Sequence, residues 1–301
     1  MISKLRTITD LAEAEAQWRA HIPPETIFDL WEVRMAFHRH FGRPLRFLAG
    51  NTENNKFFLP LSWVEEKGAW CFFPGETWSN KTWLEQNRLY CEYIDKESLT
   101  SELGSDFHLG FVRSAPDSLP VLEVDEIGYL FFPHCYRYDM ENWWADLGHK
   151  HAKNLHREIT AFKRRGIQIH QGCEKHFDLM VEMNLTRFGE TSYFADSRFR
   201  EGFRDMLAVL FRKRLLRVVV LEVDGTPAAV DFGSVYQGRY TLLAGGTDVR
   251  LPGVAKLINL HHMEWACAAR LDEVDFLCGD FSWKRLFHLT ARPQYLFTSM
   301  A

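Results

Sequence analysis

The sequence has no long hydrophobic run and no strong excess of charge. No uninterrupted apolar stretch approaches the roughly 20 residues that a membrane helix needs. Residues 1–10 lack the apolar core of a secretory signal peptide. The formal net charge of -4 over 301 residues gives no general reason to expect nucleic acid or an anionic membrane as a partner. These absences predict a cytoplasmic protein with no transmembrane segment and no DNA partner.

The cysteines and histidines also lack the spacing of a metal site. None of the 6 cysteines forms a Cys-x-x-Cys pair. The pairs His261-His262 and His38/His40 do not have the i, i+4 spacing of helical zinc ligands. We therefore expect no metal, ordinary packing or surface histidines, and mostly buried free thiols of the kind found in a reducing compartment.

Hydrophobic residues make up 46% of the chain and include 24 Phe and 10 Trp, so the chain can bury a large core. The predicted elements occur in the same order twice. The first half has helical patterns over 11–20 and 28–41, strands over 45–49, 56–64 and 69–73, a helix over 82–90 and a strand over 106–112. The second half has helices over 184–188 and 201–214, strands over 217–223, 226–235 and 239–244, a helix over 256–270 and a strand over 273–277.

This repeated order predicts an α/β fold with a mixed sheet, built from two similar units in tandem. The joint is expected near Tyr138, which gives units of 1–138 and 139–301. Asp139 is expected to cap one long amphipathic helix over 140–165.

The most informative segment lies in the second half. Residues 240–246 form a β-type run that ends in two glycines. The next loop contains an Arg-x-x-Gly-x-Ala motif, formed by Arg250, Gly253 and Ala255, and the helical pattern over 256–270 follows. Small residues let the backbone approach a ligand, and free N–H groups at a helix start bind anions. The segment therefore predicts a site for a phosphate-bearing cofactor.

Each part of this segment also has a purely structural interpretation. Pro252 suits the first position of a helix, so the loop could be an ordinary helix start. Gly245 and Gly246 suit either the close approach of a ligand or a simple β-turn.

With its meander, loop, helix and following strand, the second half resembles the GNAT superfamily of acyl-CoA N-acyltransferases. The signature loop of that superfamily is Gln/Arg-x-x-Gly-x-Gly/Ala, and the match at Arg250, Gly253 and Ala255 is complete. The resemblance implies an acyl-CoA cofactor, acetyl-CoA or another, whose pantetheine arm pairs with the splayed strand end. The cofactor-binding residues it implies are Leu243, Ala244, Gly245, Arg250, Gly253, Val254, Ala255 and Lys256.

A narrower likeness follows downstream. The run from Asp275 to Lys284 resembles the D-F-x-x-G…(aromatic)-K element of cellulose-biosynthesis-type acetyltransferases, which are related to the Fem-type aminoacyltransferases. Both groups carry two tandem GNAT-like units. The first half departs from the pattern, because no Arg-x-x-Gly-x-Ala loop follows Gly75. The first unit is therefore expected to be a degenerate copy without the CoA signature.

Acyl transfer to an amine needs a group that accepts the amine proton. Asp231 interrupts an apolar strand pattern, and an acidic residue there needs a partner or an exposed position. Asp231, Asp280 and Lys284 are the predicted catalytic residues, and Asp275 is a further acidic candidate with a structural role as the alternative. For Asp231 the alternative is an outward-facing strand residue, and for Lys284 it is a surface role.

The segment 149–165 is rich in Lys, Arg and His. It could form a basic face for a phosphate-bearing substrate or for tRNA, or simply a solvated helix face. Three functions stay open at this point. The first is an acyl-CoA-dependent N-acyltransferase acting on an amine, such as a sugar or cell-envelope precursor in polysaccharide biosynthesis. The others are a Fem-type aminoacyl-tRNA-dependent transferase and a non-catalytic GNAT-like binding protein.

Overall fold

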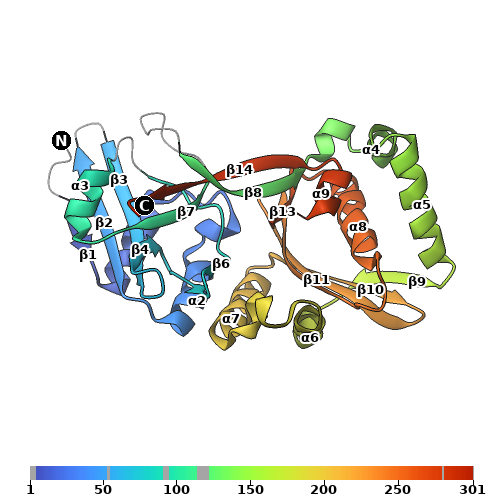
Figure 1. Cartoon of the computed structure of the whole chain (residues 1–301), viewed down its shortest axis with the longest axis horizontal. Coiled ribbons are helices and arrows are strands. Elements are labelled where there is room, and N and C mark those ends of the chain that lie inside the picture. The colour runs from blue at the N-terminus through green and yellow to red at the C-terminus, as the bar shows by residue number, and fades with distance from the viewer. Residues whose placement is uncertain (1–4, 53–54, 91–94, 114–121, 280, 301) are drawn as a thin grey trace. The chain divides into compact units, whose positions relative to one another are not determined.

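A computed structural model describes residues 5–52, 55–90, 95–113, 122–279 and 281–300 (Figure 1). The chain divides into two compact units that are not continuous in sequence. Unit 1 contains Met1–Ile127, Asp196–Met206 and Pro293–Ala301, and unit 2 contains Gly128–Ala195 and Leu207–Arg292. The division therefore differs from a single joint near Tyr138, because two short later segments belong to unit 1.

Unit 1 begins with two helices and a four-stranded antiparallel sheet of order β1-β2-β3-β4. Its helices are α1 (Leu11–His21), the 3-10 turn η1 (Ile27–Asp29), α2 (Trp31–Phe41) and α3 (Lys96–Leu103). Its strands are β1 (Arg6–Ile8), β2 (Leu45–Thr52), β3 (Asn55–Val64), β4 (Ala69–Phe72), the short hairpin β5 (Thr77–Trp78) and β6 (Lys81–Thr82), and β7 (His108–Val112). Strand β7 pairs with the C-terminal part of β14 (Thr290–Thr298), as in the pair Tyr295↔Val112.

The prediction of a helix over 82–90 is wrong. The segment is extended and pairs with strands through bridges at Asn87↔Val112 and Phe58↔Tyr90. Two of its N–H groups, those of Trp83 and Leu84, donate to the buried carboxylate of Glu76. Most of its side chains are buried, including the polar ones of Glu85, Gln86 and Asn87. The spacing of its apolar residues therefore does not mark one face of a helix.

Unit 2 contains a mixed sheet of order β8-β13-β12-β11-β10-β9. The strands are β8 (Glu123–Phe131, of which 128–131 belong to this unit), β9 (Ile167–Gln171), β10 (Leu216–Val223), β11 (Thr226–Tyr236), β12 (Arg239–Thr247) and β13 (Glu273–Cys278). The helices are η2 (Pro133–Tyr136), α4 (Met140–Asp146), α5 (His149–Lys163), η3 (Glu174–His176), α6 (Phe177–Phe188), η4 (Gly189–Thr191), η5 (Tyr193–Ala195), α7 (Ser197–Arg212, shared with unit 1), α8 (Val254–Ala268) and α9 (Ser282–Leu286). Only β12 and β13 pair in parallel among these strands; the other pairs are antiparallel.

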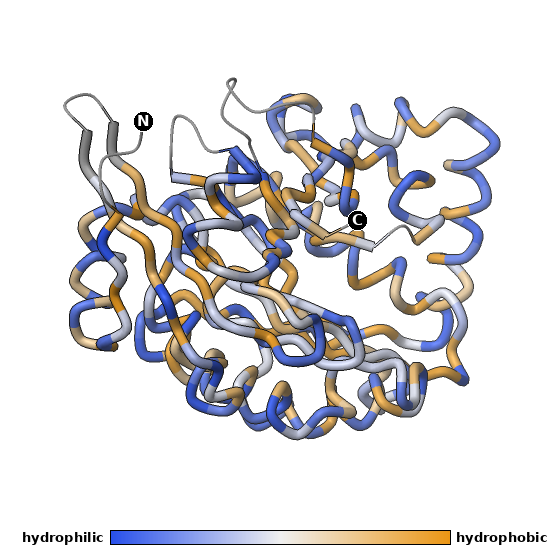
Figure 2. Tube along the Cα trace, turned by 60° about the vertical axis from the view of Figure 1, so that its left-hand side comes forward, coloured by the Kyte–Doolittle hydropathy of each residue, from blue (hydrophilic) through white to orange (hydrophobic). Residues whose placement is uncertain are grey.

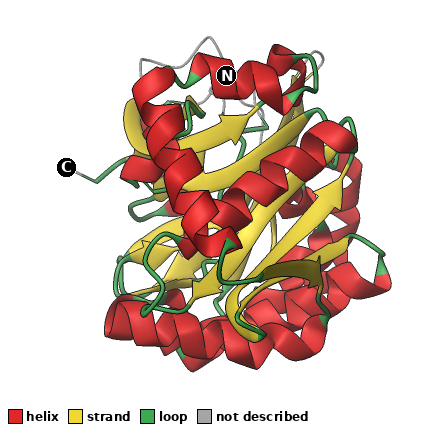
Figure 3. Cartoon of the chain, turned by 90° about the vertical axis from the view of Figure 1, so that its right-hand side faces the viewer, coloured by secondary structure: helices red, strands yellow, loops and turns green. Residues whose placement is uncertain are grey.

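Helices cover both faces of the unit 2 sheet. Helix α8 packs on one face, and α6 packs on the other against β11 and β12 (Figures 1 and 3). An apolar cluster joins α5 and α8 to the sheet and includes Phe162, Leu221, Val254 and Ile258. The hydrophobic residues follow the strands in Figure 2, as expected for strands covered by helices. The fold is therefore α/β with a mixed sheet, as predicted.

Most predicted elements of the second half are confirmed, but one helix is not continuous. The pattern over 140–165 forms two helices, α4 and α5, because the chain turns at Gly148 with a φ of 72°. Strands β8 and β14 were not predicted. Residues 114–120, whose Pro116 and Pro120 predict a loop, lie outside the described residues. Cys71 and Cys267 are buried as expected, whereas Cys135 is exposed.

None of the helices in the described part of the chain is both long and apolar enough to cross a bilayer.

Candidate active site

Strand β12 separates from its parallel neighbour halfway along its length. It pairs with β13 only at Arg239↔Glu273, Tyr240↔Val274 and Thr241↔Asp275. For residues 242–247 the structure records no pairing with β13 among the described residues, although these residues still pair with β11. This half of β12 therefore presents main-chain N–H and C=O groups toward the side from which β13 has diverged.

A β-bulge marks the place where the strands separate. Phe232 of β11 pairs with Ala244, whereas the next residue, Gly233, pairs with Leu242, so Leu243 is the extra residue. A bulge bends its strand and increases its twist. The predicted residues Leu243, Ala244 and Gly245 thus lie in the bent, separated half of β12. Leu243 itself is buried.

The loop after β12 leads directly into α8. Gly253 is the N-cap residue, with a φ of 95°, and no side chain caps the helix. The helix begins at Val254, two residues earlier than predicted. The N–H groups of Gly253 and Ala255 have no hydrogen-bond acceptor among the described residues. A positive φ favours glycine, and the free donors at the helix start provide a weak positive potential.

Two basic residues of the motif region already have acidic partners. The Arg250 guanidinium pairs with the carboxylate of Asp248 at 2.7 Å and is 80% exposed. Lys256 Nζ lies 2.6 Å from Oε2 of Glu158 on α5. The same carboxylate oxygen would lie 3.5 Å from a Cβ placed on Gly253. A carboxylate from α5 therefore lies at the helix start, where the sequence predicts a site for a phosphate-bearing cofactor.

The two glycines of β12 face opposite sides of the sheet. A Cβ on Gly245 would overlap Oδ1 of Asp231, and a Cβ on Gly246 would overlap the backbone oxygen of Met180 on α6. Neither residue forms a β-turn. Their lack of side chains is needed to accommodate neighbours within unit 2, which the sequence did not suggest.

Asp231 is buried and belongs to a polar network on the α8 face of the sheet. Its Oδ2 lies 2.9 Å from Nε2 of His262, whose side chain is fully buried. Nδ1 of His262 lies 2.9 Å from Nη1 of Arg217. The interpretation of Asp231 as an outward-facing residue is therefore wrong. Burial lowers the pKa of His262, the hydrogen bond that the ring makes to the Asp231 carboxylate opposes that shift, and Arg217 adds to it.

Lys284 holds the end of β13 in place. Its Nζ donates hydrogen bonds to the carbonyl oxygens of Phe276 (2.9 Å), Leu277 (2.8 Å) and Cys278 (2.9 Å). These three bonds use all three donors of an ammonium group. The surface role considered for Lys284 is excluded, since the residue is buried. Its catalytic role stays a prediction, and its contacts here are structural.

The described residues give no support for a catalytic role of the other two acidic candidates, Asp280 and Asp275. Asp280 lies outside the described residues. Asp275 accepts the N–H of Leu277 and forms an ion pair of 2.7 Å with Arg292, which agrees with the structural alternative considered for it.

Sequence reasoning missed three residues of this region: Arg217, His262 and Glu158. His262 was expected to be an ordinary packing or surface histidine. The available signal was Asp231 itself, because an acidic residue in a buried strand requires a polar partner from another element. Glu158 gave no comparable signal, since it lies within a helix full of charged residues.

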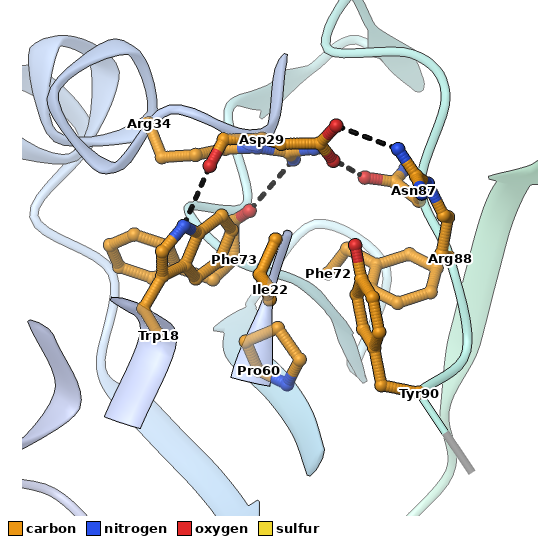
Figure 4. Close-up of a pocket in the computed structure, with 10 residues that line it drawn as sticks. All are labelled: Trp18, Ile22, Asp29, Arg34, Pro60, Phe72, Phe73, Asn87, Arg88 and Tyr90. Atoms are coloured by element: carbon orange, nitrogen blue, oxygen red, sulfur yellow. Dashed lines mark hydrogen bonds and ion pairs between the residues drawn. The ribbon is translucent and has the colours of Figure 1, made fainter. Parts of the chain in front are cut away.

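Unit 1 contains a small cavity (Figure 4). It is lined by Trp18, Ile22, Asp29, Arg34, Pro60, Phe72, Phe73, Asn87, Arg88 and Tyr90. Its volume of about 10 Å³ is room for about one water molecule. The Arg34 guanidinium crosses it and donates to Phe73 O at 2.9 Å and to Oδ1 of Asn87 at 2.8 Å.

Residues 149–285 match the family profile described as an acetyltransferase (GNAT) domain. This region of the chain is therefore similar to GNAT acetyltransferase domains. This match begins at the first residue of α5 and includes β12, the motif loop, α8 and Lys284. No curated protein sequence matches the chain significantly.

Solved structures share the fold over nearly the whole chain at low identity. FemX is 8% identical with a TM-score of 0.58, and the match covers 98% of this chain and 97% of that one. A conserved protein of unknown function from Bacteroides thetaiotaomicron is 12% identical with a TM-score of 0.58, and the coverages are 97% and 99%. The C-terminal domain of a putative lysylphosphatidylglycerol synthetase from Agrobacterium fabrum is 11% identical with a TM-score of 0.52, and the coverages are 95% and 93%. The region similar to GNAT domains thus lies within a chain whose fold is similar to that of FemX over nearly its whole length.

Proposed function

We propose that the protein is an acyl-CoA-dependent N-acyltransferase, with acetyl-CoA as the first candidate donor. The observation that carries this proposal is the separation of β12 from β13 immediately before the Arg-x-x-Gly-x-Ala loop. The main chain of residues 242–247 has no pairing with β13 among the described residues, although Gly245 O accepts a hydrogen bond from Nδ2 of Asn184. This edge is suited to pair with an extended pantetheine arm, as an added strand would. The free N–H groups of Gly253 and Ala255 are suited to a diphosphate.

The proposed roles follow from these positions. The main chain of Leu243, Ala244 and Gly245 holds the thioester arm and supplies an N–H to the oxyanion of the tetrahedral intermediate. Gly253, Val254, Ala255 and Lys256 hold the diphosphate, together with Arg250 once it leaves Asp248. Asp231 accepts the proton of the amine, and Asp280 and Lys284 remain further candidates in the transfer.

The acceptor is proposed to be an amine on a sugar or cell-envelope precursor, modified in the cytoplasm. Unit 1 is proposed to be a degenerate GNAT-like copy, consistent with its small cavity and with the absence of the motif loop. The resemblance alone suggests this acceptor class. Assays with a panel of amines would identify the acceptor.

Calorimetric titration of the full chain with acetyl-CoA tests the donor site. We expect saturable binding at one site. Ala255→Glu places a carboxylate at the helix start, where it suits the helix but repels a diphosphate, so binding should fall at least tenfold. Ala255→Gln is the matched neutral control and should bind nearly normally. If acetyl-CoA does not bind the wild type, the proposal fails. If Ala255→Glu binds as well as Ala255→Gln, the cofactor is placed wrongly.

A second function, aminoacyl transfer from a charged tRNA, is favoured by one observation. The Glu158 carboxylate already pairs with Lys256 at the start of α8, and a diphosphate would have to displace it. A donor without a diphosphate at this point would not meet that repulsion. The fold similarity to FemX is consistent with such a donor. Transfer of a radiolabelled amino acid from aminoacyl-tRNA to the amine panel, without acetyl-CoA binding, would favour this function over the first.

A further inference from the structure

Arg217, His262 and Asp231 form a continuous chain of hydrogen bonds across β10, α8 and β11, in which His262 and Asp231 are buried and Arg217 is half-buried. The contacts are Arg217 Nη1 to His262 Nδ1 and His262 Nε2 to Asp231 Oδ2, each at 2.9 Å. We propose that Arg217 and His262 are positioning residues, which hold the Asp231 carboxylate as the proton acceptor beside the separated half of β12. This inference rests on the proposed acyl transfer.

The contacts of His262 determine which ring nitrogen carries its proton. A guanidinium can only donate, so Nδ1, which faces Arg217, must be the acceptor. A neutral imidazole carries a single N–H, which therefore lies on Nε2 and donates to Asp231. The lone pair on Nδ1 of His262 already accepts a hydrogen bond from Arg217. His262 is therefore not itself available as a base.

Charged and polar groups reach His262 from every element packed around it. Asp231 comes from β11, Arg217 from β10 and Tyr240 from β12, with the Tyr240 hydroxyl 3.5 Å from Nε2. His261, the neighbour on α8, has Nε2 3.4 Å from Nη2 of Arg217. Burial and the neighbouring groups His262 and Arg217 lower the pKa of His261 to about 4. Both histidines therefore remain neutral, and Arg217 is the only cation next to the ring among the described residues.

Arg217 is held in place by more than its hydrogen bonds. Its guanidinium lies 3.9 Å from the centre of the Trp265 ring and 5.2 Å from that of Tyr240. Stacking of this kind suits the planar guanidinium and would not be reproduced by lysine. The positive charge thus has a fixed place at the far end of the chain from Asp231.

The other end of the chain lies against β12. Asp231 is in register with Gly245, and its Oδ1 occupies the space that a side chain on Gly245 would need. In the proposed step, the amine nitrogen bonds to the thioester carbon and its proton passes to Asp231, directly or through a water molecule. The C–S bond then breaks, and the leaving thiolate takes that proton back from the Asp231 carboxyl.

Nitrogen-15 NMR of the histidines in the full chain tests the arrangement without any substrate. We expect His262 to show the neutral Nε2–H tautomer at pH 7 and to protonate at a lower pH than a free imidazole, because burial lowers its pKa. In Arg217→Met, Nδ1 is released and the neighbouring cation is lost, so the ring should protonate at a higher pH than in the wild type. An Nδ1–H tautomer in the wild type, or protonation of His262 near pH 6.5, would overturn the inference.

Kinetics then test the positioning role, with acetyl-CoA as donor and glucosamine as the amine probe. His262→Met removes the donor to Asp231, and kcat should fall about 100-fold while KM for acetyl-CoA is unchanged. His262→Gln retains an N–H at the position of Nε2 and should recover kcat to within about fivefold of the wild type. Glu264→Gln, an exposed change on the same helix, is the control.

The possible failures are distinguishable. If the wild type neither binds nor uses acetyl-CoA, the proposed function fails, and NMR still decides the arrangement of the chain. If the wild type is active and Asp231→Asn keeps its kcat, the positioning inference fails while the function stands. Equal losses in His262→Met and His262→Gln, with both variants folded, would also refute it.

Discussion

The two units differ in what lies between the last strand of the meander and its parallel partner. Each contains a three-stranded meander whose last strand is followed, across a helix, by a parallel partner. In unit 1, β4 has a single parallel bridge, Trp70↔Phe107, and the extended segment after β6 pairs with β7 through Asn87. In unit 2, β12 and β13 share three pairs and then separate. The opening is thus filled by the chain itself in unit 1, whereas residues 242–247 of unit 2 keep an unpaired edge toward β13 among the described residues.

In unit 1 the strand edge is satisfied by main-chain hydrogen bonds from the chain itself, whereas in unit 2 it is left available to a ligand. The N–H of Asn87 donates to Phe111 O at 2.9 Å, and its carbonyl accepts from Arg113 at 2.8 Å, as a ligand strand would. Arg34 fixes the segment from the other side. A strand edge needs such partners, because unpaired main-chain groups cost free energy when buried. This supports the proposal that only unit 2 retains a donor site.

The largest expected effect comes from breaking the closed unit. Arg34→Met removes the donors to Phe28 O, Phe73 O and Asn87 Oδ1, and leaves these buried acceptors without partners. We expect a loss of about 3–5 kcal/mol in the free energy of unfolding, measured in urea. Arg39→Met, an exposed change on the same helix, should cost less than about 0.5 kcal/mol. Similar losses in the two variants would mean that Arg34 does not hold the segment.

The second prediction concerns the two glycines of the open strand. In Gly246→Ala the new methyl group meets the backbone of α6, which cannot move alone, so we expect a loss of about 2–3 kcal/mol. In Gly245→Ala it meets the end of the Asp231 side chain, which can shift more easily than a helix backbone, so stability should fall less, about 1 kcal/mol. Urea unfolding of both variants measures the difference. The reverse order would show that Asp231 is held more rigidly than α6.

Sequence patterns predicted the parts of the fold that local periodicity determines. The meander over β10, β11 and β12 was recognisable from apolar strands and the turn at Asp224-Gly225. The segment over 82–90 was not, because most of its side chains are buried and its hydrogen bonds go to distant strands. Strands β8 and β14 likewise depend on pairing between distant parts of the chain, which no local pattern records.

The same distinction applies to the candidate site. The motif loop is a continuous stretch of sequence, so it could be found with its helix. The pair Asp231–His262 spans 31 positions, and the pair Glu158–Lys256 spans 98. Such contacts depend on how helices pack on the sheet. An acidic residue in a buried strand predicts that some partner exists, but only the fold shows that the partner is His262.

The third prediction uses the neutral histidines of unit 2. The pKa of His261 is lowered to about 4 in the folded chain, against 6.5 in the unfolded chain. The unfolded state therefore binds more protons below pH 6.5, and stability falls as the pH decreases toward 4. The contribution at pH 5.5 is about 1 kcal/mol. In His261→Gln, the loss of unfolding free energy between pH 7 and pH 5.5 should shrink by that amount. His149→Gln, an exposed change on α5, should leave it unaltered. An equal pH dependence in both variants would show that His261 is not held neutral.

The smallest expected effect concerns how strongly Glu158 opposes the binding of a diphosphate at the start of α8. Glu158→Gln removes one carboxylate from the start of α8 and releases Lys256 to pair with a phosphate instead. Since the pair is partly exposed, the gain should be modest, about a fivefold lower Kd for acetyl-CoA by calorimetry, or roughly 1 kcal/mol. Glu264→Gln makes the same change of charge elsewhere on unit 2 and should leave Kd within about twofold. A weaker affinity in Glu158→Gln would mean that Glu158 supports the bound donor rather than competing with it. Because the carboxylate lies 3.5 Å from the Cβ position of Gly253, its removal acts directly at the proposed diphosphate position. In unit 2 a single side chain, Glu158, would then compete with the donor, whereas in unit 1 a whole segment of the chain occupies the strand edge.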